Sequence, residues 1–157
     1  MRMLIIAAAM LAGGAAFGQS ITVEAVKAQL VLENTGALSE NIVGSKKKFH
    51  NTVSGGGEAG EPSNSILVTF VFKGPSGQKS SDKIARDLAN VTITQRGPKT
   101  KVLVKRVLGS FAFSPQGLTY RAVLLEDATC APLEIDVKIA RSQKTERIAF
   151  SCDEPKV

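Results

Sequence analysis

The feature that most constrains the fold of this chain is a two-residue alternation of apolar side chains. In one run, from Ser65 to Lys73, and in another, from Leu133 to Ile139, every second residue is a large apolar one. These residues are Ile66, Val68, Phe70 and Phe72 in the first run, and Leu133, Ile135, Val137 and Ile139 in the second. Because successive side chains of a β-strand point to opposite faces, the pattern predicts half-buried strands. A shorter run through Ala28, Leu30 and Leu32 predicts a further strand.

Three turn sequences predict antiparallel hairpins. The turns are Arg96–Lys99, Ser114–Gly117 with proline second and glycine fourth as in a type I turn, and Arg141–Lys144. Closing each turn aligns apolar residues across the two strands, which fixes a register because a one-residue slip would reverse every side chain. The predicted pairs are Ile93 with Val102, Val91 with Val104, Phe113 with Leu118, Phe111 with Tyr120, Val107 with Leu124, Val137 with Ile148, Ile135 with Phe150 and Leu133 with Cys152.

One segment departs from this strand pattern. In Ser81–Asn90, Ile84 and Leu88 are four residues apart and Ser81 can cap a first turn, which predicts a short helix. Short strands, tight turns and one helix together predict an all-β antiparallel β-sandwich, immunoglobulin-like or similar, with a small barrel as the second choice. The chain has no tryptophan, so it lacks the Cys-Trp-Cys pattern of antibody domains.

The N-terminus predicts export. Met1 and Arg2 precede an apolar run from Met3 to Ala12, and small residues follow it, which is the order of a signal peptide. A membrane anchor is the alternative, but a span needs about 20 apolar residues and this run is shorter. We therefore predict a signal peptide over residues 1–18, and a single domain over residues 19–157 in the periplasm or outside the cell. No transmembrane segment is expected in the mature chain.

The two cysteines, Cys130 and Cys152, both fall in the mature part. Oxidising conditions outside the cytoplasm and an even count predict that they form a disulfide bond; the alternative is two buried free thiols. The predicted third hairpin supports the bond, since Cys152 would lie at its open end and Cys130 just before its first strand.

No catalytic, metal or cofactor motif emerges from the sequence. His50 is the only histidine, so a hydrolase that pairs it with a loop serine is the enzymatic alternative. The loop Gly74–Ser80 follows a strand as a phosphate-binding loop does, but Gln78 stands where that motif requires glycine. These observations favour a protein without enzymatic activity, metal or cofactor, which works by binding or scaffolding. An inhibitor of a cell-wall-degrading enzyme is a third hypothesis.

Basic residues gather around one predicted turn, in a chain whose formal net charge is +6. Arg96, Lys99, Lys101, Lys105 and Arg106 line the predicted hairpin around Gly97, and in the predicted register the three lysines share an outer face. The candidate binding residues are Arg96, Lys99, Lys101 and Lys105. A row of exposed basic side chains of this kind can attract anionic polymers. The alternative, which we prefer on sequence grounds, is a charged sheet edge that prevents strand-to-strand aggregation. Candidate partners are thus an anionic polymer or another envelope protein.

Overall fold

The computed structural model describes residues 20–45, 62–63, 65–74, 87–97, 99–126 and 131–150. These residues form seven strands and no helix. In chain order the strands are β1 (Thr22–Val31), β2 (Ser65–Lys73), β3 (Ala89–Gln95), β4 (Lys101–Leu108), β5 (Leu118–Leu125), β6 (Leu133–Ile139) and β7 (Ser142–Ile148).

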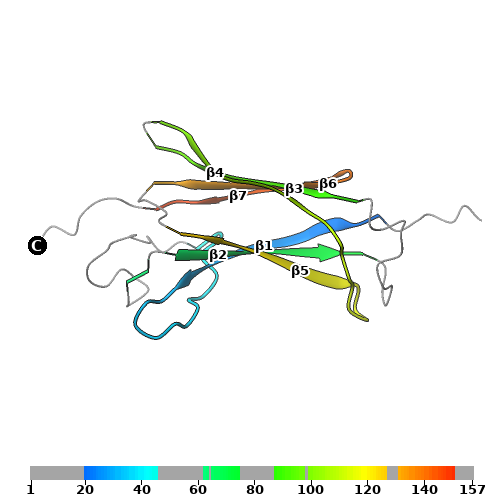
Figure 1. The fold of residues 1–157 in the computed structure, drawn as a ribbon, viewed down its shortest axis with the longest axis horizontal. Helices are drawn as coiled ribbons and strands as arrows, with labels where there is room; N and C mark the ends of the chain where they lie inside the picture. Colours follow the sequence, from blue (N-terminus) through cyan, green and yellow to red (C-terminus); the bar gives the residue numbers. More distant parts are fainter. Residues whose placement is uncertain are drawn as a thin grey trace, which may run out of the picture.

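The strands make two antiparallel sheets that stack as two layers (Figure 1). One sheet has three strands in the order β1-β2-β5, and the other has four in the order β4-β3-β6-β7. The chain passes from one sheet to the other after β2, after β4 and after β5. The predicted all-β arrangement of antiparallel sheets is therefore confirmed in its coarse form, and it is consistent with a sandwich.

The core lies between the two layers and consists of the predicted alternating residues. Every second residue of β2 and of β6 is buried, as the sequence predicted. Phe111, which follows β4, is also fully buried, and its ring centroid lies 4.9 Å from that of Phe72. The aromatic contact joins the crossover after β4 to the middle of the three-stranded sheet.

The predicted short helix is wrong at its C-terminal end. Ala89 and Asn90 belong to β3, where Ala89 is fully buried and pairs with Leu108 and Ile139. Burial against two neighbouring strands outweighs the weak helical spacing of this segment. Asp87 and Leu88, which precede β3, are not helical either. Residues 81–86 lie outside the described residues, as does the predicted signal peptide.

The β6–β7 hairpin is tighter than predicted. Ile139 pairs with Ser142, so the turn consists of Ala140 and Arg141 alone, and Ala140 adopts a positive φ of 48°. Two-residue hairpin turns commonly require positive φ, and an alanine gives no sequence signal for it. Ile148 consequently faces Leu133, and the predicted pairing of Ile148 with Val137 is wrong.

A β-bulge changes the predicted β3–β4 register. Val102 pairs with Thr94 but Val104 pairs with Ile93, which leaves Leu103 as an extra residue on β4. The loop is also one residue longer than predicted, because Gln95 pairs with Lys101. The longer loop and the bulge together place Val104 opposite Ile93 and Arg106 opposite Val91, so the predicted pairs of Ile93 with Val102 and of Val91 with Val104 are wrong. Val102 is 55% exposed, whereas Leu103 and Val104 pack against the core.

The turn at Ser114–Gly117 is confirmed, but its predicted strand partners are wrong. The N–H of Gly117 donates to the carbonyl of Ser114 at 2.8 Å, and Gly117 has φ +74°. Phe111 and Val107 do not pair with β5, because β4 and β5 lie in different sheets. β5 pairs instead with β2, with Val71 opposite Tyr120. Apolar matching across a turn depends only on neighbouring residues, so it does not reveal that the chain changes sheets here.

Candidate functional site

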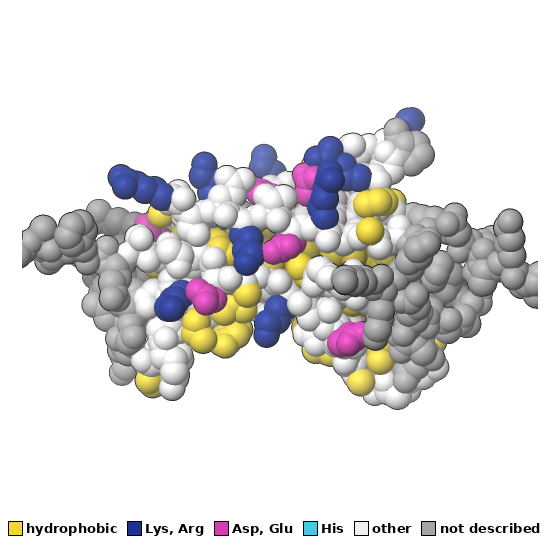
Figure 2. All heavy atoms as spheres, turned by 180° about the vertical axis from the view of Figure 1, so that it is seen from behind, with side chains coloured by type: hydrophobic (Ala, Val, Ile, Leu, Met, Phe, Trp, Pro, Cys, Tyr) yellow, Lys and Arg dark blue, Asp and Glu magenta, His cyan; other side chains and the backbone are white. Residues whose placement is uncertain are grey.

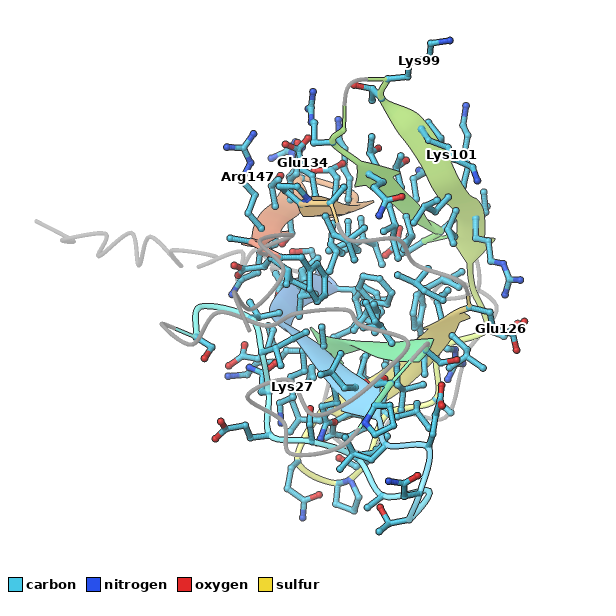
Figure 3. All side chains as sticks on the ribbon, turned by 90° about the vertical axis from the view of Figure 1, so that its left-hand side faces the viewer. Lys27, Lys99, Lys101, Glu126, Glu134 and Arg147 are labelled. Atoms are coloured by element: carbon cyan, nitrogen blue, oxygen red, sulfur yellow. The ribbon has the colours of Figure 1, made fainter. Side chains whose placement is uncertain are left out.

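The β3–β4 hairpin and the segment after it carry positive charge without any acid. From Leu88 to Leu125 the sequence contains six basic residues and no aspartate or glutamate. They are Arg96, Lys99, Lys101, Lys105, Arg106 and Arg121. The hairpin projects beyond the body of the four-stranded sheet (Figure 1), and Lys99 lies at its tip (Figure 3). Four of the predicted cationic residues therefore belong to one protruding element.

Arg96 differs from the other three predicted cations because it is already paired. Its guanidinium donates to Glu134 on β6 at 2.7 Å, and Arg147 on β7 binds the same carboxylate at 3.2 Å. The hydrogen bond from Arg96, followed by the charge of that residue and the contacts of Arg147, lowers the pKa of Glu134. Figure 3 shows Glu134 and Arg147 side by side. Arg96 thus joins the base of the hairpin to β6 and β7.

The three lysines are exposed and have no ion-pair partner among the described residues, but they do not share one face. Lys105 pairs with Thr92, whose side chain points to the outer face of the sheet. Lys101 pairs with Gln95, which is buried on the sandwich-facing side. The bulge at Leu103 causes this division, so the prediction that Lys101 and Lys105 share a face is wrong.

On the outer face of the four-stranded sheet, the described carboxylates have hydrogen-bond partners other than these lysines. Glu134 binds the two arginines, and Asp136 accepts hydrogen bonds from Gln143 at 2.9 Å and from Thr145 at 2.7 Å. In Figure 2, lysine and arginine side chains follow the rim formed by this sheet. The described part of this face therefore has an excess of cations at β4.

One side of the sandwich is closed by contacts between the sheets. The N–H of Val23 donates to Ser142 Oγ at 2.9 Å, and Lys144 Nζ donates to the carbonyl of Glu24 at 3.3 Å. These bonds join β1 to β7.

The opposite side, between β4 and β5, is open over part of its length. A groove of about 440 Å³ lies there, lined by Lys101, Val102, Leu103, Val104 and Arg106 of β4 and by Leu124, Leu125 and Glu126 at the end of β5. Figure 3 shows Lys101 and Glu126 on this same side of the molecule. Arg106 pairs with Val91, a core residue, so its side chain leaves β4 toward the groove side.

Arg121 closes the other end of this open side. Its guanidinium donates to the carbonyls of Ser110, Gly109 and Tyr120, and it lies over the ring of Phe111. Arg106 belongs to the basic residues that the sequence placed around Gly97, whereas Arg121 was not predicted as a site residue. A signal for Arg121 was present, because it occupies an inward-facing position between the buried residues Thr119 and Val123.

Other predicted site residues lie outside the described residues. These are His50, on which the hydrolase alternative depends, and both cysteines. Within the described ranges, no group of three or more potential metal-binding side chains gathers. The same ranges contain no helix that is long and apolar enough to cross a membrane.

No family model matches this chain, and neither the curated proteins nor the solved structures include a significant match.

Proposed function

We propose that this chain is an exported, non-enzymatic binding protein of the periplasm or cell exterior, which contacts anionic polymers through its β3–β4 hairpin. The observation that carries the proposal is the protruding hairpin with its exposed lysines, Lys99, Lys101 and Lys105, none of which has an ion-pair partner in the described structure. The signal-peptide pattern of residues 1–18 supports export.

The strand order supports an immunoglobulin-like sandwich as the framework. β1, β2 and β5 correspond in order to strands A, B and E of such domains, and β3, β6 and β7 correspond to C, F and G. β4 then lies beside β3, as an added C′ strand does. A fold of this kind serves many functions, so the proposal depends on the hairpin's charge and not on the fold.

Binding of this kind requires no fixed stereochemistry in the ligand. Flexible lysines neutralise phosphate, sulfate or carboxylate groups and release the counterions that surrounded the polymer. Three or four such contacts predict a log–log salt slope of about −2 to −4. The affinity should therefore fall steeply as salt increases.

The test is retention of the mature protein on a polyanion column, such as heparin or immobilised polyphosphate, at low salt. Reversing the charge at the hairpin with Lys99→Glu and Lys105→Glu should lower the salt concentration of elution and flatten the slope. The matched control is Lys27→Glu with Lys73→Glu, which changes the net charge equally on β1 and β2, in the sheet that does not contain the hairpin. Absence of retention at low salt, or equal losses in both pairs, contradicts the proposal.

A further inference from the structure

The free edge of β5 has backbone groups with a known orientation. β2 pairs with one side of β5 along its whole length without a register shift. On the other side, the N–H of Leu118 donates to Ser114 Oγ at 3.2 Å and its carbonyl accepts from Ser114 N at 2.8 Å. The N–H and C=O of one strand residue point the same way and alternate along the strand. Tyr120, Ala122 and Leu124 therefore also present their backbone groups to the free edge.

The two halves of this edge differ. In the first half, from Leu118 to Tyr120, the backbone groups already have partners within the chain. Ser114 bonds to the N–H and C=O of Leu118, and Arg121 donates to the Tyr120 carbonyl at 3.0 Å. In the second half, the backbone N–H and C=O of Ala122 and Leu124 have no partner among the described residues. An unpaired strand edge of this kind is a template for another strand.

The two faces of the open half differ in chemistry. On the outer face of this half Leu124 is 49% exposed, and Tyr120, at its border with the occupied half, is 55% exposed. On the inner face, the edge borders the groove that Lys101 and Arg106 of β4 line. In a strand added at this edge, every second side chain would lie on the outer, apolar face, and the side chains between them would point to the inner face with its two cations.

We propose that the free edge of β5 at Ala122–Glu126 is a strand-addition site for an extended segment of a partner protein in which apolar and acidic residues alternate. The backbone of Ala122 and Leu124 supplies the ladder, Tyr120 and Leu124 contact the apolar residues, and Lys101 and Arg106 pair with the carboxylates. Charge complementarity selects this partner, because neither cation forms an ion pair with a described residue, and the groove that they line holds two cations against the single carboxylate of Glu126.

Two other arrangements fit the observations less well. A second copy would bring its own β5 to the edge, and that strand has no acidic residue between Leu118 and Leu125. The edge of β4 is less suited to strand addition, since the bulge at Leu103 interrupts its ladder and three cations repel a regular neighbour.

The probe is a capped octapeptide in which valine and glutamate alternate. One control peptide alternates valine and lysine. The other, the block peptide, has four valines followed by four glutamates. Tyr120 is the only tyrosine and the chain has no tryptophan, so intrinsic fluorescence reports directly from the proposed site. We expect a saturable fluorescence change with the alternating acidic peptide only. Equal binding of the lysine or block peptide, or no binding of the acidic one, overturns the proposal.

Ala122→Pro tests the ladder itself. It removes an N–H that faces the free edge, which an edge strand tolerates because the bonds to β2 are kept. We expect this variant to weaken peptide binding by about tenfold or more, as for a lost interface hydrogen bond. Ala122→Val keeps the N–H and should keep the binding. Unchanged binding by Ala122→Pro overturns the proposal.

Reversing the two cations with Lys101→Glu and Arg106→Glu tests the pairing without altering the β5 backbone. The double variant should bind the lysine peptide more tightly than the glutamate peptide. If it still binds the glutamate peptide more tightly, the proposal is overturned. Self-association without peptide that Ala122→Pro abolishes would assign the edge to a second copy instead. Retention on the polyanion column should be unchanged in Ala122→Pro, which separates this site from the proposed function of the hairpin.

Discussion

The guanidinium of Arg121 lies over the ring of Phe111, with 5.6 Å between its central carbon and the ring centroid. The same group binds the carbonyls of Gly109 and Ser110, in the segment where the chain leaves one sheet for the other. Arg121 therefore holds a crossover, and the Phe111 ring that follows it in the core, against β5.

Replacing Arg121 with methionine should destabilise the fold. The variant keeps an apolar stem but loses charge-assisted hydrogen bonds and a cation–π contact, which together suggest a loss of about 1–3 kcal/mol. Urea unfolding would show this as a lower midpoint with an unchanged slope. Arg141→Met, in the exposed β6–β7 turn, is the control. Equal urea midpoints for the two variants would show that the contacts of Arg121 add nothing measurable to the stability of the fold.

Glu134 should make the stability depend on pH in the acid range. Its ionised form is favoured in the folded state, first by the hydrogen bond from Arg96, so its pKa lies below the ordinary value of 4.5. A lowered folded pKa gives stability that is present above the unfolded pKa and is lost as pH falls through the folded pKa.

Comparing unfolding of the wild type with that of Glu134→Gln tests this. The wild type should be the more stable near neutral pH, and the difference should shrink below pH 4.5 and with added salt. The salt dependence is expected because the pair is exposed. If the stability difference between the wild type and Glu134→Gln grows as the pH falls below 4.5, the pKa of Glu134 is not lowered in the folded state.

The sequence predicted the elements of this fold better than their pairing. Strands with a strict alternation, β2 and β6, were predicted with the correct buried face, because only one face of each can meet the core. The three hairpin registers failed for separate reasons. A bulge at Leu103 and a positive φ at Ala140 are local backbone choices with no glycine to mark them. The change of sheet after β4 depends on the whole topology.

The candidate site was predicted in composition but not in geometry. The basic residues around Gly97 do lie on one hairpin, as their closeness in sequence required. Which face each lysine takes depends on the bulge, so Lys101 was placed on the wrong side. The direction of Arg106 toward the groove and the free backbone of Ala122 could not be predicted, because both depend on β4 and β5 being edge strands of two different sheets.

Export should remove the N-terminal segment. Made in a secreting bacterial host, the mature protein should begin near Gln19, because Ala16 and Gly18 provide the small residues that signal peptidase requires. Intact-mass spectrometry of the exported protein measures this directly. Retention of Met1 on exported material would contradict it.

The disulfide between Cys130 and Cys152 remains a prediction, and the observed hairpin supports it. Leu133 pairs with Ile148 and not with Cys152, so the predicted pairs of Leu133 with Cys152 and of Ile135 with Phe150 are wrong. In the sequence, however, Cys130 precedes Leu133 and Cys152 follows Ile148 by similar short distances, at the open end of β6–β7. Peptide mapping without reduction should recover the two cysteine peptides linked. Loss of the bond should cost about 2–5 kcal/mol. Two titratable thiols per chain in exported protein would refute it.

The lysines of β4 should also keep this strand from pairing with other molecules. β4 is an edge strand whose free side is flanked by Val102 and Val107, 55% and 59% exposed, so charge is the main feature that opposes edge-to-edge contact. Lys101→Val with Lys105→Val should therefore produce concentration-dependent association in sedimentation velocity experiments. The matched pair Lys27→Val with Lys138→Val removes the same charge elsewhere and should stay monomeric. Association of both pairs would point to lowered net charge as the cause. If neither pair associates, the lysines are not what prevents edge-to-edge contact of β4, and the prediction is wrong.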